Sequence, residues 1–121
     1  MPEDSSRRFD RDVRSVGAAR RFAVETADRW GVDARDIALV VGELAANAVV
    51  HGNSAFEVRL RQDRRVHVEV SDLGSDEVRR EPVAPQVEHG RGLEIVDHLA
   101  ADWGVRQVPE GGKVVWARIE T

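Results

Sequence analysis

Ile37-Ala-Leu-Val-Val-Gly-Glu-Leu-Ala-Ala-Asn-Ala-Val-Val-His51 is the stretch that decides the fold. Its strongly polar side chains, Glu43, Asn47 and His51, recur every four residues. Because an α-helix turns once in about 3.6 residues, this spacing stacks all three on one face of an otherwise apolar helix. The stretch predicts a largely buried helix with one polar stripe. That stripe must meet a core network, a partner helix, a metal or a bound ligand.

Composition predicts a single domain spanning residues 1–121, since 41% of the chain is hydrophobic. The 18 basic and 22 acidic residues give a net charge of −4, which provides no basic footprint for direct nucleic-acid or membrane binding. The absence of cysteine excludes disulfides and thiolate metal sites. Without an apolar signal region or a stretch of roughly 18 apolar residues, we expect a cytoplasmic protein.

Upstream of the central helix, the pattern predicts a strand and a first helix. A short edge strand is expected over Ser5–Asp10. Apolar residues at three- and four-residue steps then predict a helix that ends near Gly31. Asp33 is the expected N-cap of the central helix, which runs to about His51. Gly52-Asn53-Ser54 is typical of a helix stop and turn.

Downstream, the hydrophobic pattern changes to that of strands. Alternating hydrophobic residues over 56–60 and 66–70 predict an antiparallel hairpin. The polar stretch from Gly74 to Gly90 has no sustained periodicity, which suits a mobile lid at about 75–89 or an ordinary surface loop.

The last third of the chain adds a short helix and two strands. The helix is expected over Leu93–Ala100, and the strands over about Trp103–Val108 and Lys113–Ile119. The order is then strand, helix, helix, strand, strand, helix, strand, strand. It predicts an α+β fold: a two-layer α/β sandwich with a mixed, mostly antiparallel sheet and helices on one face.

Asp72 ends the predicted strand Val66–Asp72 on the same face as its valines. Burying a carboxylate is costly unless donors surround it, so we expect something to hydrogen-bond Asp72. Two interpretations stay open. Asp72 forms a turn in Ser71-Asp72-Leu73-Gly74, or it accepts from an amine-bearing ligand, since an ionised carboxylate offers only acceptors.

Gly90-Arg91-Gly92 precedes the last predicted helix. Glycines allow close backbone approach, and a helix start presents unpaired N–H groups to anions. A glycine pair in a loop is, however, commonly just a tight turn. The P-loop and dinucleotide-binding patterns are both missing from the sequence.

The polar stripe of the central helix offers chemistry of its own. Asn47 supplies a neutral oxygen that suits Mg²⁺, and Glu43 could orient or deprotonate a hydroxyl or water. The stripe could also simply face solvent or a partner. His51 is expected to be a helix C-terminal cation or a satisfied core histidine. The other histidines are His67, His89 and His98, and they lack the spacing of metal ligands. We therefore predict no zinc site built from protein side chains.

In this order and spacing, Glu43-Leu-Ala-Ala-Asn47-Ala-Val-Val-His51, Asp72-Leu-Gly74 and Gly90-Arg91-Gly92-Leu93 resemble the histidine-kinase-like (GHKL, Bergerat-fold) ATPase superfamily. Within it, the chain looks most like small stand-alone anti-sigma-factor serine kinases and actinobacterial ATP-binding regulators. The features shared with these are Trp103-Gly104 and Gly111-Gly112-Lys113-Val114-Val115-Trp116.

The resemblance extends from about Phe9 to Ile119 and implies an ATP site. Asn47 would ligate the Mg²⁺ that bridges the ATP phosphates, and Glu43 would be the general base. Asp72 would accept from the adenine amino group. The remaining expected nucleotide contacts are backbone groups beside the base or around the phosphates: Gly74, Gly90, Arg91, Gly92 and Leu93.

The resemblance also implies partners. In the family, phosphate passes to a serine of a small anti-anti-sigma (STAS-type) protein, which competes with a sigma factor for the kinase. Homodimerisation is an open option. We expect partner and dimer contacts on the first helix, where three positive charges gather: Arg14, Arg20 and Arg21. Charged helix faces are, however, usually just solvated.

Two departures from the family pattern keep other functions open. Asp76 replaces the second glycine of Asp-x-Gly-x-Gly, and Gly112-Lys113-Val114 lacks the hydroxyl expected near the adenine-binding aspartate. A non-catalytic nucleotide-binding protein that sequesters a sigma factor or other regulator is therefore the main alternative. A catalytic domain detached from a two-component histidine kinase is a third.

Overall fold

A computed structural model describes residues 3–52, 54–72, 91–109 and 111–120, with backbone alone for residues 91–93. Its elements, in chain order, are β1 (Glu3–Phe9), α1 (Arg14–Trp30), α2 (Arg35–His51), β2 (Phe56–Gln62), β3 (Val66–Asp72), α4 (Arg91–Leu99), β4 (Asp102–Gln107) and β5 (Lys113–Ile119). This is the order of helices and strands predicted from the sequence.

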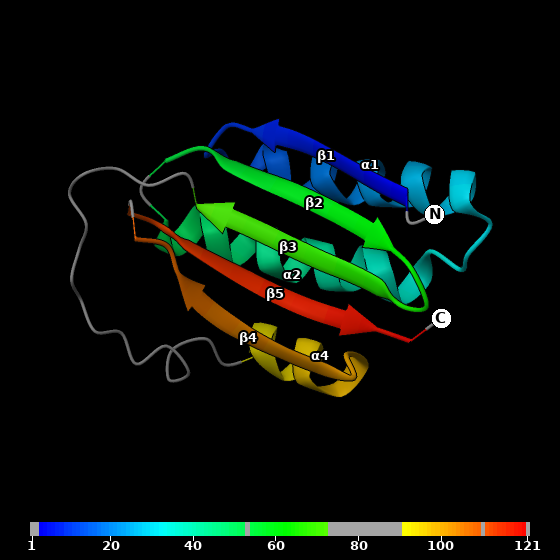
Figure 1. Ribbon diagram of the computed structural model, residues 1–121. Coiled ribbons are helices and arrows are strands. Elements are labelled where there is room, and N and C mark those ends of the chain that lie inside the picture. The colour runs from blue at the N-terminus through cyan, green and yellow to red at the C-terminus, as the bar shows by residue number, and fades with distance from the viewer. Residues whose placement is uncertain (1–2, 53, 73–90, 110, 121) are drawn as a thin grey trace.

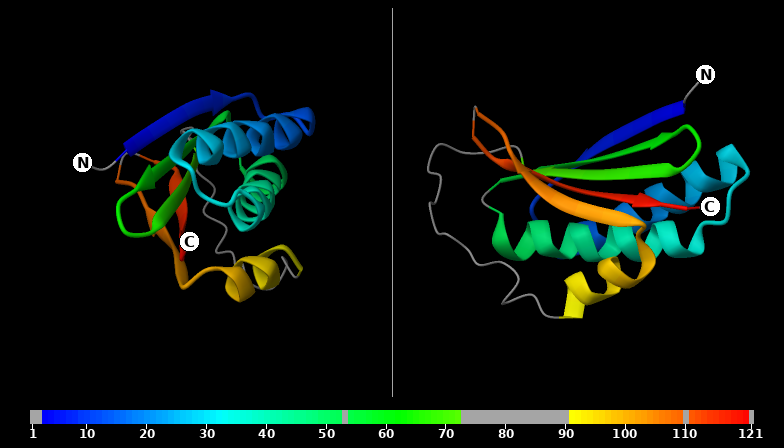
Figure 2. Two further views of the ribbon diagram at one scale, coloured as in Figure 1. Left: turned by 90° about the vertical axis from the view of Figure 1, so that its right-hand side faces the viewer. Right: turned by 60° about the horizontal axis from the view of Figure 1, so that its bottom comes forward.

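The strands form one sheet in the order β1-β2-β3-β5-β4 (Figure 1). All described helices lie on one face of this sheet, while its other face is left uncovered by any described element (Figure 2). The predicted two-layer α+β sandwich is confirmed. The sheet is more regular than expected, because every pairing between described strands is antiparallel.

The core lies between the sheet and the helices. Alternation in β2 and β3 buries Phe56, Val58 and Leu60 together with Val66 and Val68, each at most 1% exposed. Burying each side chain of this size contributes about 1.5–3 kcal/mol. The predicted hairpin register is therefore set by one continuous apolar face.

Helix α1 covers the β1 side of the sheet with an alanine-rich stripe around Phe22. It ends where predicted, because Gly31 adopts the left-handed conformation with φ 72° and donates its N–H to Ala27 O and Asp28 O. Glycine is the residue that takes this conformation without steric cost. The chain can then turn back and begin α2.

The predicted N-cap of α2 is wrong by one residue. Ala34 occupies the cap position, while Asp33 Oδ1 accepts the backbone N–H of Arg35 at 2.9 Å. Asp12 does the same before α1, accepting the N–H of Arg14 at 2.8 Å. Both aspartates satisfy the first helical N–H from two residues upstream, as in an Asx turn.

Helix α4 begins at Arg91, two residues earlier than predicted. Gly92 is therefore inside its first turn rather than ahead of it. The helix packs against α2 and is joined to β4 by a hydrogen bond from Trp103 Nε1 to Asp97 Oδ1 at 3.0 Å. The lid predicted at about 75–89 lies outside the described residues. Among the described helices, none is both long and apolar enough to cross a membrane.

Candidate nucleotide site

The central helix carries the predicted polar stripe. Glu43 and Asn47 are half-buried on α2, whereas His51 is exposed at its last residue. The flanking residues Val41, Leu44 and Ala45 are at most 1% exposed. The polar stripe thus borders the buried face of a helix whose other side is exposed at Leu39 and Val50. His51 takes the helix C-terminal position, and the alternative of a core histidine is wrong.

The C-terminal end of α2 meets the C-terminal end of β3. Gly52 closes the helix by donating its N–H to Ala48 O at 2.9 Å. A Cβ added to Gly52 would lie 3.5 Å from Asp72 Oδ2. The C-terminal ends of α2 and β3, two segments far apart in the sequence, lie at the same end of the molecule (Figure 1).

Ser54 is a polar partner of Asp72. Its hydroxyl lies 3.0 Å from Asp72 Oδ1 and 2.8 Å from Ala55 O, and its single proton can be donated to one of them at a time. The expectation that a donor would satisfy Asp72 is confirmed. The carboxylate is half-buried beside Phe56, its register partner on β2.

The sequence pattern predicted Gly52 and Ser54 only as parts of a turn. It did not predict that both lie near Asp72. The available signal was the hairpin register. If Val58 pairs with Val70, then Phe56 pairs with Asp72, and the turn before Phe56 must lie beside the carboxylate.

The structure shows where the side chains of Lys113 and Val114 lie in the segment that lacks the expected hydroxyl. Val114 pairs with Ser71 on the outer face of the sheet, away from the face of Asp72. By alternation, Lys113 shares the inner face with Val115 and therefore the side on which Asp72 lies. Lys113, rather than Val114, is the side chain that this chain presents toward that region.

The expected phosphate-binding segment is only partly described. Arg91, Gly92 and Leu93 form the first turn of α4, and their side chains lie outside the described part of the structure. Gly74, Asp76 and Gly90 fall in the segment that is not described. Helix α4 packs against α2, and a helix N-terminus is the kind of element that offers unpaired N–H groups to phosphates.

Within the described residues, no group of three or more His, Asp or Glu side chains is placed to hold a metal ion. Asn47 offers one half-buried amide oxygen, which fits a cation such as Mg²⁺ that keeps several waters and is shared with substrate phosphates.

The arginines expected to contact partners from α1 have neighbours within the chain. Arg14 pairs with Asp12 through two guanidinium bonds of 3.1 and 3.0 Å. Arg20 lies across Gly42, where an added Cβ would come within 2.4 Å of its Nε. Gly42 thus lets an α1 side chain cross α2 directly beside Glu43.

Residues 9–119 match the histidine kinase-like ATPase domain family. The chain belongs to this family, and an ATP-binding function is what the domain implies. A comparison with curated proteins gave no match. The finer assignment therefore depends on the residues of this chain.

Proposed function

We propose that this protein is an ATP-dependent serine kinase that also acts as an anti-sigma factor. It phosphorylates a small anti-anti-sigma partner of the STAS type and sequesters a sigma factor when that partner is phosphorylated. The observation that carries the proposal is the half-buried pair Glu43 and Asn47, one turn apart on the α2 stripe, in a family that binds ATP.

Each polar group has one task in this proposal. Asp72 accepts from the adenine amino group, with its carboxylate oriented by Ser54. Glu43 takes the proton from the partner's serine hydroxyl as the serine oxygen bonds to the γ-phosphorus. The bond from the γ-phosphorus to the bridging oxygen breaks at the same time, and ADP carries away the bonding electron pair.

Asn47 is the proposed ligand for Mg²⁺, which supplies charge neutralisation on the phosphates when bound. The amide contributes an oxygen without adding negative charge beside Glu43. Replacing it with aspartate would put two carboxylates one helical turn apart and would raise the pKa of at least one of them.

The second candidate is a nucleotide-binding protein that sequesters a regulator without phosphorylating anything. Two features favour it: Asp76 adds a negative charge to the Asp72 motif, and the hydroxyl of the late glycine motif is replaced in Gly112-Lys113-Val114. In this version nucleotide binding controls the affinity for the partner, and Glu43 has no chemical task.

Phosphate transfer from labelled Mg-ATP to candidate STAS partners distinguishes the two. The kinase proposal expects an acid-stable phosphoserine on the partner, whose formation Glu43→Gln reduces by at least about a hundredfold, the usual scale for general-base removal. Glu25→Gln, on the exposed side of α1, is the matched control and should retain activity. Partner binding without transfer would favour sequestration, and an acid-labile phosphoryl group would favour histidine-kinase chemistry.

A further inference from the structure

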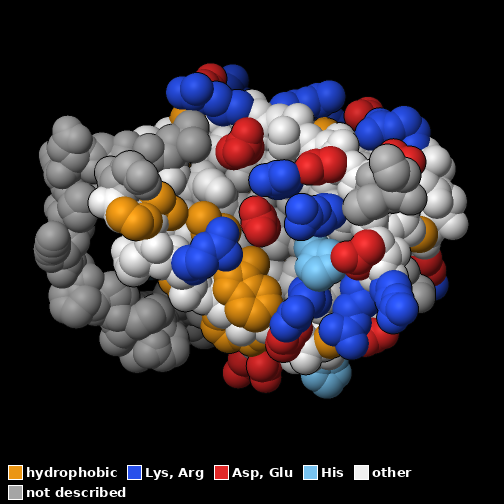
Figure 3. Space-filling view, in the orientation of Figure 1, with side chains coloured by type: hydrophobic (Ala, Val, Ile, Leu, Met, Phe, Trp, Pro, Cys, Tyr) orange, Lys and Arg blue, Asp and Glu red, His pale blue; other side chains and the backbone are white. Residues whose placement is uncertain are grey.

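The uncovered face of the sheet is hollowed between β3 and β5. The hollow measures about 220 Å³ and lies over the register pair Val68 and Ala117, whose own side chains are buried in the core. Positive and negative side chains are intermixed over this face (Figure 3). Because drug-sized ligands occupy roughly 300–1,000 Å³, this smaller hollow suits a small molecule or a single long side chain.

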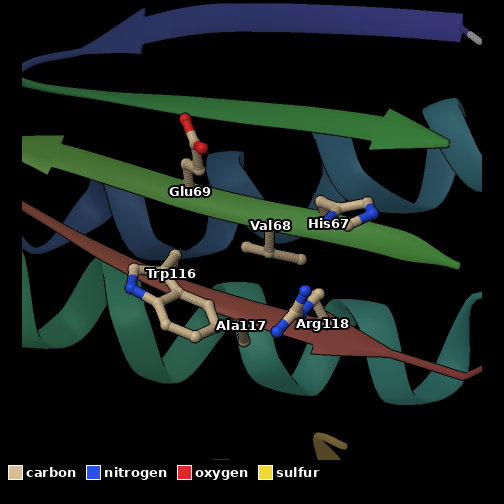
Figure 4. Close-up of a pocket in the computed structure, with 6 residues that line it drawn as sticks. All are labelled: His67, Val68, Glu69, Trp116, Ala117 and Arg118. Carbon is tan, nitrogen blue, oxygen red and sulfur yellow. The ribbon is translucent and has the colours of Figure 1, made fainter. Parts of the chain in front are cut away.

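Four polar or aromatic side chains line the hollow as two register pairs. His67 and Arg118 form one end, and Glu69 and Trp116 form the other. Figure 4 shows the imidazole and the carboxylate on β3, and the indole and the guanidinium on β5. Since residues two apart along a strand are separated by about 6.8 Å, the two ends lie about that far apart.

The acidic end carries a carboxylate that is not used in an ion pair. Within the described residues, Glu69 pairs with no basic side chain. Its register neighbour on β2, Arg59, is already paired with Asp4 at 2.8 Å. The Glu69 carboxylate is turned toward β2 in Figure 4, and rotating it over the hollow breaks none of these ion pairs. An ionised carboxylate offers only acceptors, so this end suits a donor such as an ammonium group.

The basic end is a guanidinium with one side left open. Arg118 donates to Asp102 through Nε at 2.8 Å and through Nη2, which fixes the orientation of its planar group. Its Nη1 donates to no acceptor in the part of the chain that the structure describes. His67 borders this end, with Nε2 3.3 Å from Asp63 Oδ1. A guanidinium held in this way presents its remaining N–H groups to a second carboxylate.

Trp116 provides an apolar wall beside both charges. Its ring packs on Gly104, where an added Cβ would come within 2.8 Å of the indole. The guanidinium carbon of Arg118 lies 5.4 Å from the ring centroid. The indole is therefore fixed by its neighbours and is still partly exposed. Such a ring offers a contact surface for the methylene groups of a ligand.

The two ends together favour a ligand that carries both signs of charge. A purely cationic ligand would meet Arg118, and a purely anionic one would meet Glu69, so each would leave like charges opposed. In an α-amino acid a single carbon separates the charged groups, which is too short for ends about 6.8 Å apart. An ammonium and a carboxylate joined by several methylene groups reach both ends.

We infer that this hollow binds an ω-amino acid group, in which an ammonium and a carboxylate terminate an aliphatic chain. The ammonium pairs with Glu69, the carboxylate with Arg118, and the methylene groups lie along Trp116. The same chemistry occurs in a free ω-amino acid and in a lysine at the C-terminus of a protein. The hollow lies on the face of the sheet opposite the helices (Figure 2), so the inference does not depend on the proposed kinase activity.

An NMR titration of the full chain with 6-aminohexanoate tests the inference. Saturable shifts should appear in the backbone amides of residues 67–69 and 116–118 and in the Trp116 indole signal. A dissociation constant on the order of 1 mM is expected for so small a ligand. Hexanoate and hexylamine each keep only one of the two charges and should bind at least about fivefold more weakly.

Glu69→Gln is the decisive variant, because it keeps the shape of the side chain and removes its charge. It should weaken 6-aminohexanoate binding about fivefold. Glu57→Gln is the matched control, since Glu57 lies on the same face of the sheet and does not line the hollow. Its affinity should equal that of the wild type, and the amide spectrum of each variant verifies its fold.

Nα-acetyl-lysine, which copies a C-terminal lysine, distinguishes the two sources of the ligand group. Tighter binding of this compound than of 6-aminohexanoate would support a protein C-terminus as the source, and the reverse order would support a free ω-amino acid. Three results would overturn the inference: no saturable shifts in the wild type, equal binding of hexanoate or hexylamine, or undiminished binding by a folded Glu69→Gln variant.

Discussion

The hydroxyl of Ser54 lies 3.0 Å from Oδ1 of Asp72, across the junction between the end of α2 and the end of β3. This contact ties the adenine-binding candidate to the turn that closes the helix bearing Glu43 and Asn47. The base-binding and phosphate-binding parts of the proposed site are therefore positioned by one structural junction.

Ser54→Ala should weaken Mg-ATP binding without unfolding the protein. One orienting hydrogen bond is worth about 0.5–1.5 kcal/mol, which corresponds to a loss of about 2- to 13-fold in affinity. Calorimetric titration measures it. Ser71→Ala, one residue before Asp72 but on the opposite face of the sheet, is the matched control. Equal affinities for Ser54→Ala and the wild type would show that the contact is not used.

Gly52→Ala should destabilise the fold by about 1–3 kcal/mol, because its Cβ would lie 2.5 Å from the carbonyl oxygen of Ala48, a backbone atom that cannot easily move. Gly17→Ala is the control within α1. A Cβ there meets only Arg21 Nη1 at 3.6 Å, so the substitution should stabilise the helix by about 0.5–1 kcal/mol. Urea unfolding of both variants measures whether the free energy of unfolding falls for Gly52→Ala and rises for Gly17→Ala.

Thr26→Val should stabilise the protein by about 1 kcal/mol, because it relieves an unsatisfied polar group. Thr26 is fully buried on α1, and its Oγ1 has no hydrogen-bond partner among the described residues. Valine keeps the shape and removes the hydroxyl. Thr26→Ser keeps the hydroxyl and loses the methyl group, so its melting temperature should fall. A lower melting temperature for the valine variant would contradict the assignment.

Asp12→Asn should flatten the dependence of stability on pH in acid. The guanidinium of Arg14, and then its backbone N–H, lower the pKa of Asp12 from 3.8 to about 2. A lowered pKa in the folded state gives stability that is present above 3.8 and is lost as the pH falls toward about 2. Urea unfolding across this range should show a shallower slope for the variant. Equal slopes for the variant and the wild type would show that Asp12 does not contribute to the loss of stability in acid.

The sequence alone predicted an element correctly where a periodic pattern and a local signal agreed. The α2 stripe, the hairpin from Phe56 to Asp72 and the stop at Gly31 follow from side-chain spacing and glycine geometry, and all are confirmed. The start of α4 was predicted two residues too late, because Gly90-Arg91-Gly92 is also typical of a turn ahead of a helix, whereas the helix begins at Arg91.

Other features depend on contacts that no local pattern contains. The approach of Gly52 and Ser54 to Asp72 requires the strand register. The strand order β1-β2-β3-β5-β4 likewise places β5, the last strand of the chain, between β3 and β4, which no local pattern contains.

The most direct measurement is a calorimetric titration of Mg-ATP into the wild-type protein and into Asp72→Asn. The account predicts micromolar-range binding by the wild type and its loss in the variant, because an amide can place a donor where the adenine amino group needs an acceptor. Binding of equal strength by both proteins would contradict the assignment of Asp72. A wild type that binds no nucleotide would contradict the central claim itself.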